Sequence, residues 1–288
     1  MQLSNLKSFI YQKTPYFILR SFSHSKEVIR YLEKYGFSMI LNLNDYAISR
    51  PILVKGVHEA SVTKVFKQYM KPNLRFIDIG ANLGYYSLLV ASQCPNSKIY
   101  SFEPDLKNFQ LFSSSITYNQ FQDRIQAYCL AVGSENKIIT ISDLGNNSNS
   151  GARFTGDNKE VLRPYIHGEN PYFREVEAVQ LDSFLPDFKI DLVKIDIEGY
   201  EPFAIQGMFN IIKQNKPIIF LEFAPSNLKN IGLTEPEKFL QIFTDMEYNI
   251  NIINKQGDTI SYGREITQFF RDFFQYKVHH LDLLLLPT

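Results

Sequence analysis

A short apolar run that begins at Arg75 carries one acid, Asp78, and ends in a turn that contains Gly80, Asn82 and Gly84. Glycine lacks a Cβ atom, and asparagine is among the few other residues that reach the left-handed backbone region readily. An apolar helix follows, so the turn is expected to present backbone N–H groups at a helix start. This strand, turn and helix predict a site for a nucleotide-like ligand.

Two features of this segment distinguish between possible ligands. The turn reads G-x-N-x-G and lacks the middle glycine of the dinucleotide fingerprint G-x-G-x-x-G. Asp78 would repel a pyrophosphate but suits an ammonium group, such as the one that S-adenosylmethionine carries beside its sulfonium. Glu103 follows Gly84 at close to the roughly 20-residue offset at which an acid meets ribose hydroxyls. The pattern therefore favours S-adenosylmethionine over a nicotinamide cofactor.

A second group of charged residues, Lys194, Asp196 and Glu198, lies in and just after another apolar run. Side chains alternate in direction along a strand, so these three share one face. Charges in a buried parallel strand are costly unless they are paired, which predicts an ion pair of Lys194 with Asp196 or Glu198. Asp196 is our candidate for the acid that activates or aligns a hydroxyl, with Lys194 and Glu198 beside it.

Other polar residues carry weaker signals. Glu201 suits the first turn of a helix, where acids are favourable. Glu222 lies at the end of an apolar run, and both a site role and a solvated strand end fit it. His58, His279 and His280 show no metal-ligand spacing with cysteines or acids, so they are assigned no role and no metal is predicted.

From residue 75 onward, apolar runs alternate with helical patterns, which is typical of an α/β protein with helices on both faces of a mostly parallel sheet. The expected strands are 75–79, 98–103, 125–132, 190–197 and 217–223, with two more at 249–254 and 281–286. The expected helices are 84–93, 105–117, 200–214, 235–246 and 264–275.

Residues 1–70 are interpreted as an α+β cover over a binding domain formed by residues 71–288. Within the cover, the pattern predicts an amphipathic helix at 25–35, a strand at 37–48 and a helix at 58–70. Residues 143–174 are rich in glycine, asparagine and proline and predict a long irregular insertion. Such an insertion is either a substrate-binding loop or a segment with no role.

Composition excludes several classes of protein. Thirty basic and thirty acidic residues give no net charge, which argues against binding to nucleic acid or to an anionic membrane. Charged and polar residues interrupt the N-terminal apolar runs before they reach the length of a signal-peptide core or a membrane span. The two cysteines, Cys94 and Cys129, have no disulfide or metal pattern, so we expect a cytoplasmic protein.

Several motifs in the same order resemble the FkbM-type methyltransferase family. They are Glu59 with Thr63, F-I-D-I-G-A-N-L-G-Y-Y-S from Phe76, S-F-E-P from Ser101, Asn119, A-V-G from Ala131, L-D from Leu181 and K-I-D-I-E-G-Y-E from Lys194. The resemblance covers about residues 55–225. It implies a Rossmann-like sheet of seven strands with the last strand antiparallel.

The resemblance also implies site residues. Asp78, Gly80, Asn82 and Gly84 would hold the methionine part of the cofactor and Glu103 its ribose, while Asp196 and Glu198 would face the reaction centre. We group three further motif residues with the cofactor-binding set: Glu59, Tyr85 and Asn119.

The implied function is S-adenosylmethionine-dependent O-methylation of a hydroxyl on a sugar, a glycan or glycolipid, or a natural product such as a polyketide. The expected partner is thus a small-molecule or carbohydrate acceptor and no nucleic acid. Two alternatives remain, namely a methyltransferase that acts on protein or nucleic acid and a non-catalytic module that only binds the cofactor.

Overall fold

The computed structural model describes residues 26–143, 154–163, 172–185, 189–276 and 278–288. In these residues a central sheet has eight strands in the order β13-β12-β14-β11-β10-β3-β4-β5. Their bounds are β3 Arg75–Ile79, β4 Lys98–Phe102, β5 Ile125–Tyr128, β10 Leu192–Ile195, β11 Ile218–Phe223, β12 Tyr248–Ile253, β13 Thr259–Gly263 and β14 Leu281–Pro287.

The pairing of these strands confirms the expected architecture. The strands from β5 to β11 are parallel, and β14 lies antiparallel between β11 and β12. The seven expected strands are present, and β13 adds an eighth at the edge beside β12. Most β13 side chains are exposed, so the strand lacks the apolar pattern by which a buried strand is recognised.

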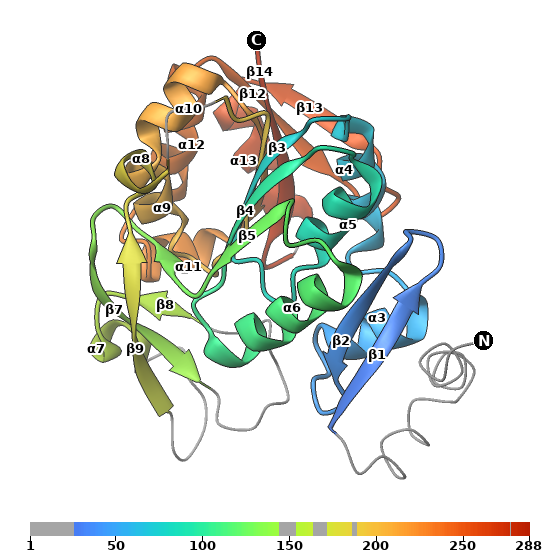
Figure 1. Ribbon diagram of the computed structural model, residues 1–288. Coiled ribbons are helices and arrows are strands. Elements are labelled where there is room, and N and C mark those ends of the chain that lie inside the picture. The colour runs from blue at the N-terminus through green and yellow to red at the C-terminus, as the bar shows by residue number, and fades with distance from the viewer. Residues whose placement is uncertain (1–25, 144–153, 164–171, 186–188, 277) are drawn as a thin grey trace, which may run out of the picture.

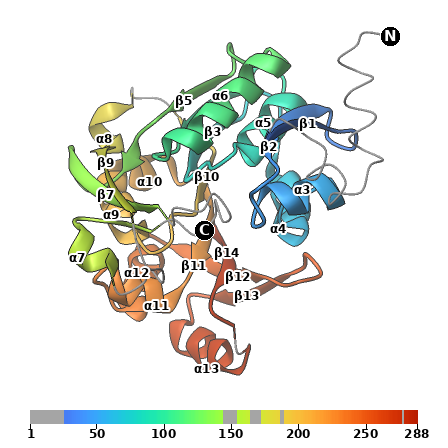
Figure 2. The same cartoon turned by 90° about the horizontal axis from the view of Figure 1, so that it is seen from below.

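Helices cover both faces of the central sheet (Figures 1 and 2). One face packs against α4 (Ala60–Phe66), α5 (Tyr85–Gln93) and α6 (Leu106–Asn119). The other packs against α9 (Glu201–Gly207), α10 (Phe209–Asn215), α12 (Pro236–Asp245) and α13 (Ile266–Tyr276). The expected helix at 200–214 is therefore two helices that meet at Met208. No helix in the described residues is both long and apolar enough to span a membrane.

The helix predicted at residues 25–35 is wrong. Residues Glu27–Leu32 form strand β1, which pairs antiparallel with β2 (Phe37–Asn42). The buried positions Val28 and Leu32 are four residues apart, which fits both a helical stripe and one face of a strand. Pairing with β2 decides between them, because it satisfies the backbone groups of β1 while both apolar side chains stay buried.

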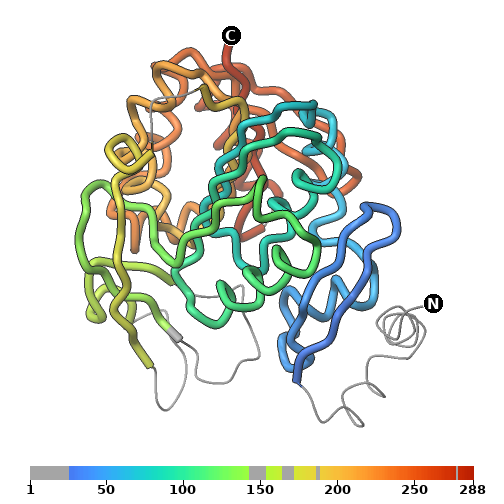
Figure 3. The backbone as a smooth tube through the Cα atoms, in the orientation of Figure 1, coloured from blue at the N-terminus to red at the C-terminus, as the bar shows by residue number. Residues whose placement is uncertain are grey.

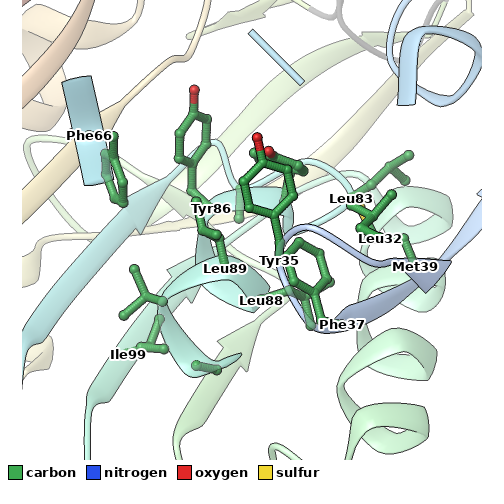
Figure 4. Packing of buried hydrophobic residues seen from close by; sticks show 14 of the residues in the cluster. Leu32, Tyr35, Phe37, Met39, Phe66, Leu83, Tyr86, Leu88, Leu89 and Ile99 are labelled. Atoms are coloured by element: carbon green, nitrogen blue, oxygen red, sulfur yellow. The ribbon is translucent and has the colours of Figure 1, made fainter. Parts of the chain in front are cut away.

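The hairpin β1-β2 packs on the helices through a shared apolar core. Figure 4 shows Tyr35 and Phe37 of the hairpin beside Leu88 of α5, and all three are buried. The rings of Tyr35 and Phe37 contact Tyr85 edge-on at centroid distances of 6.1 and 5.9 Å. The predicted strand 37–48 ends at Asn42 and is followed by helix α3 (Ser49–Lys55), whereas the predicted helix 58–70 is α4 continued by a 3-10 turn, η1 (Lys67–Tyr69).

A second sheet of four strands lies on the opposite side of the molecule from the hairpin (Figure 3). Its order is β6 (Ala131–Val132), β9 (Tyr172–Val179), β7 (Lys137–Asp143) and β8 (Thr155–Gly156). The predicted strand 125–132 is thus divided between the two sheets. The region 143–174, expected to be irregular, contains β8, α7 (Lys159–Leu162) and the start of β9, and its residues 144–153 and 164–171 lie outside the described residues.

Two short helices complete the description, α8 (Leu181–Phe184) and α11 (Pro225–Asn230). The boundary between cover and binding domain after residue 70 stays a prediction.

Candidate active site

A cavity of about 380 Å³ opens at the carboxyl ends of β3, β4, β10 and β11, where open α/β sheets bind ligands. Its size lies in the range of small-molecule sites, about 300–1,000 Å³. The segments that contribute most of its wall are the turn after β3, the chain after β4, and the end of β10 with the residues that follow it. The predicted site residues that line it are Glu59, Asp78, Gly80, Asn82, Tyr85, Glu103, Lys194, Asp196 and Glu198.

The turn after β3 is seated directly on the end of β10. Gly80 has a φ of +77°, and a Cβ atom added there would lie 2.0 Å from the carbonyl oxygen of Asp196. The backbone N–H groups of Gly80 and Ala81 both donate to the carbonyl oxygen of Phe102, each at 3.0 Å. Glycine is therefore required at position 80 by backbone angle and by close approach, and it brings the two predicted groups of site residues together.

Gly84 and Asn119 do not line the cavity within the described residues. Gly84 precedes α5 with a φ of +77°, and a Cβ atom there would lie 2.0 Å from the ring of Phe112. Asn119 ends α6, where its side-chain oxygen accepts from the N–H of Ser38 at 2.8 Å and its amide donates to the Ser38 carbonyl at 2.7 Å. The structure places both residues in contacts that hold elements together.

Asp78 is buried at the base of the cavity, on the sheet face that packs against α5. The hydroxyl of Ser87 donates to its Oδ2 atom at 2.5 Å, and the hydroxyl of Ser101 lies 2.8 Å from that of Ser87. Burial raises the pKa of Asp78 to about 6 despite this hydrogen bond. A cationic ligand near Asp78 would favour its ionised form.

Glu103 connects the turn to the start of α6. Its Oε2 atom accepts from the backbone N–H of Asn82 and its Oε1 atom from that of Asp105, both at 2.8 Å. Asn82 has a φ of +52°, so the Glu103 carboxylate helps to hold a left-handed residue in the turn. Asp105 in turn caps α6 through the N–H of Asn108.

The predicted ion pair of Lys194 with Asp196 is confirmed, with a distance of 2.6 Å between Nζ and Oδ2. Lys194 also lies 4.9 Å from the centre of the Tyr86 ring and 4.0 Å from Oε2 of Glu59, which accepts from the Tyr86 hydroxyl at 2.7 Å. Burial disfavours the charge on Asp196, but the pairing with Lys194 outweighs burial and lowers the pKa of Asp196. The carboxylate is thus ionised at neutral pH.

Glu198 differs from Asp196 although only one residue separates them. Burial and repulsion from Asp196 raise the pKa of Glu198 to about 8. Its backbone is left-handed with a φ of +54°, and its Oε2 atom accepts from the side-chain amide of Asn227 at 3.2 Å. A non-glycine residue held in this conformation is strained, and such strain is concentrated at functional sites.

The structure also brings titratable residues into the cavity that sequence reasoning did not assign to the site, among them His58, Glu222 and His280. His58 packs edge-on to the Tyr85 ring at 5.6 Å, and its Nε2 atom is 3.5 Å from Oε1 of Glu59. Nε2 of His280 lies 3.8 Å from Oε1 of Glu222.

His280 reaches this edge because β14 is antiparallel, so the residue before its first strand position lies at the carboxyl end of β11. Sequence spacing carries no signal for this, since it depends on the order of strands in the sheet. Among the described residues, no group of three His, Cys, Asp or Glu side chains could hold a metal ion.

Comparison with known proteins identifies the family. The sequence model of the methyltransferase FkbM domain matches residues 78–285. The chain belongs to the FkbM methyltransferase family. A fungal relative, "Methyltransferase 1" of Beauveria bassiana (strain ARSEF 2860), is 24% identical over 168 residues, which cover 54% of this chain and 67% of the relative.

Two solved structures are also similar to this FkbM methyltransferase. The methyltransferase FkbM from Methylobacillus flagellatus KT has 15% identity and a TM-score of 0.47, and the alignment covers 83% of this chain and 53% of that one. The chain thus spans about half the length of that protein. TYW2 of M. jannaschii, solved in complex with AdoMet, has 10% identity and a TM-score of 0.44, with coverage of 92% and 86%.

Proposed function

We propose that this FkbM methyltransferase transfers a methyl group from S-adenosylmethionine to a hydroxyl of a sugar, a glycan or glycolipid, or a natural product. The observation that carries the proposal is the seating of the Gly80 turn on the carbonyl of Asp196. This contact puts the turn that suits the cofactor next to an ionised carboxylate that can bind a hydroxyl.

The residues around the cavity fit the charges of S-adenosylmethionine. Asp78 and Glu103 supply carboxyl groups for an ammonium and for ribose hydroxyls, and the Gly80 turn leads into a nine-residue helix, α5, whose start favours a carboxylate. When bound, S-adenosylmethionine would supply a methyl group on a sulfonium for in-line displacement.

The protein's part in this reaction is alignment and proton transfer. Asp196, held by Lys194, accepts a hydrogen bond from a hydroxyl of the acceptor beside the reacting one, and this directs the reacting oxygen toward the methyl group. When the oxygen–carbon bond forms, the proton of the reacting hydroxyl would move to the ionised carboxylate of Glu198, and the electron pair of the broken sulfur–carbon bond would stay on sulfur. A pKa of about 8 suits Glu198 to this step, because a base works best when its pKa lies near the operating pH.

The walls of the cavity beside Asp196 support the proposed acceptor class. Asp196, Glu198 and Glu222 offer carboxyl oxygens, which pair well with hydroxyl donors and repel phosphates. A hydroxyl-rich, uncharged acceptor is therefore favoured over nucleic acid, in agreement with the zero net charge of the chain.

Calorimetric titration tests the cofactor assignment. We expect S-adenosylhomocysteine to bind, and Asp78→Asn to weaken its binding by more than tenfold, about 1.4 kcal/mol. The exposed Asp123→Asn is the matched control and should leave binding unchanged. Binding of NAD with no binding of S-adenosylhomocysteine would show that the assignment is wrong. The acceptor is then sought among hydroxylated compounds with labelled S-adenosylmethionine.

A further inference from the structure

The described wall of the cavity carries a large excess of acids. One lysine, Lys194, and two histidines, His58 and His280, face seven acids. The acids come from five segments of the chain and are Glu59, Asp78, Glu103, Asp105, Asp196, Glu198 and Glu222.

Four of these acids have partners that compensate their charge. Asp196 pairs with Lys194, and Arg174 pairs with Asp105. Glu103 accepts from two backbone N–H groups, and Glu59 accepts from the Tyr86 hydroxyl. Glu59 also lies 4.0 Å from Nζ of Lys194. The charges of these four acids are thus stabilised by nearby cations or, for Glu103, by two backbone hydrogen bonds.

Glu198 and Glu222 differ from these four. The contact of Glu198 with Asn227 is neutral, and the nearest cationic candidate for Glu222 is His280, whose side chain is 56% exposed. Within the described residues, the Oε2 atom of Glu222 is buried and has no hydrogen-bond partner. This pair thus presents two carboxyl groups to the cavity without a buried cation of its own.

The surroundings of the pair favour its protonated form in the free protein. Asp196, Glu201 and, opposite Glu222 in the sheet, Asp282 add further acids, against Lys194 and His280. Burial and repulsion from Asp196 and Glu198 raise the pKa of Glu222 well above its usual range. A cation that enters the cavity relieves this repulsion, so it can bind while the pair loses protons.

We propose that Glu198 and Glu222 make the cavity discriminate between the two states of the cofactor's sulfur, binding the sulfonium of S-adenosylmethionine more tightly than the neutral thioether of S-adenosylhomocysteine. This inference rests on the proposed cofactor. The two ligands differ by one methyl group and one positive charge, and their shared ammonium group is left to Asp78. After methyl transfer the pair regains protons, including the one from the acceptor, and the product is released more easily.

Titration calorimetry of the full chain with both ligands, in phosphate and in Tris at pH 7, tests this discrimination. The heats in two buffers of different ionisation enthalpy report the protons released on binding. We expect S-adenosylmethionine to bind roughly tenfold more tightly, about 1.4 kcal/mol, because its positive charge is attracted by the two carboxylates at close range. It should also release more protons than S-adenosylhomocysteine does.

Isosteric variants then assign the effect to the pair. Glu198→Gln and Glu222→Gln should each weaken binding of S-adenosylmethionine and leave that of S-adenosylhomocysteine within about twofold, and the double variant should bind both ligands equally. The exposed Glu177→Gln on β9 is the matched control and should retain the wild-type ratio.

Equal affinity of the wild-type chain for both ligands, without extra proton release, would overturn this inference and leave the cofactor assignment standing. No binding of either ligand would overturn both. The comparison of the two ligands on the wild-type chain tests the inference even if one of the variants fails to fold.

Discussion

Asp196 and Glu198 show how the surroundings separate two acids of nearly the same sequence position. Lys194 lowers the pKa of Asp196, whereas Glu198 has no such cation and burial raises its pKa to about 8. Pairs of acids with such different proton affinities are typical of sites that both bind and move a proton. The division of roles between them leads to a test at a single residue.

Replacing Asp196 by asparagine keeps its size but weakens the hydrogen bond that aligns the acceptor. We expect turnover to fall by roughly 10²- to 10⁴-fold while the affinity for S-adenosylhomocysteine changes little. The measurement is a methyl-transfer assay together with the melting temperature of the same preparation.

Asp191 provides a matched control at the other end of β10. It pairs with Lys71 at 2.9 Å and accepts from the N–H of Arg75, away from the cavity. Asp191→Asn should lower the melting temperature without a specific loss of turnover. Wild-type turnover by a folded Asp196→Asn protein would show that Asp196 has no part in the reaction.

At the scale of elements, the hairpin β1-β2 is fixed to α6 by polar contacts as well as by its apolar core. The side chain of Asn119 bonds to both backbone groups of Ser38, and the hydroxyl of Ser115 accepts from the N–H of Ile40. The hairpin also positions Tyr85, which lines the cavity. The polar contacts are therefore structural links between the hairpin and α6.

Asn119→Ala should loosen the hairpin, because it leaves partly buried backbone groups of Ser38 without partners at a cost of about 1–3 kcal/mol. We expect faster amide hydrogen exchange at Ser38 and Ile40 with unchanged affinity for S-adenosylhomocysteine. Thr117→Ala, which removes an exposed hydrogen bond on the same helix, is the control. A loss of affinity with unchanged exchange would instead support the direct cofactor contact that the family resemblance implies for Asn119.

At the scale of the whole molecule, several buried acids of the free protein have raised pKa values and therefore bind protons more tightly than in the unfolded chain. Burial raises the pKa of Asp78 to about 6 and those of Glu201 and Asp282 to about 7. Unfolding would return each to about 4. Folding therefore favours their protonated forms, and this stabilisation is complete below about pH 4 and is lost as the pH rises through 6 to 8.

The melting temperature of the ligand-free protein should thus fall by several degrees between pH 5.5 and pH 8.5. Asp196 affects the pH dependence of stability in the opposite sense. Because its pKa is lowered, it stays ionised between pH 5.5 and pH 8.5 and its contribution to stability is constant there. Glu201→Gln, which keeps an oxygen to accept from the N–H of Ile197, should flatten the curve. A melting temperature that rises with pH would contradict the assignment of these acids.

The sequence by itself determined the parts of the site that local patterns encode. The strand Arg75–Ile79 and the helix after it appear where the apolar runs and the Gly80 turn predicted them, and Asp78, Glu103 and Asp196 line one cavity as expected. These features follow from side-chain alternation and from the backbone freedom of glycine, which act over a few residues. The carboxyl ends of parallel strands share one edge, so local positions along several strands predict a common site.

The tertiary structure alone decided the rest. It formed a hairpin from residues 27–42, placed Gly84 and Asn119 in packing contacts, and brought Glu222 and His280 into the cavity. Each outcome depends on which segments far apart in the sequence become neighbours, as when antiparallel β14 places His280 beside β11. Local periodicity does not contain that information, because the free energy of pairing and burial is set by the partner segment as much as by the segment itself.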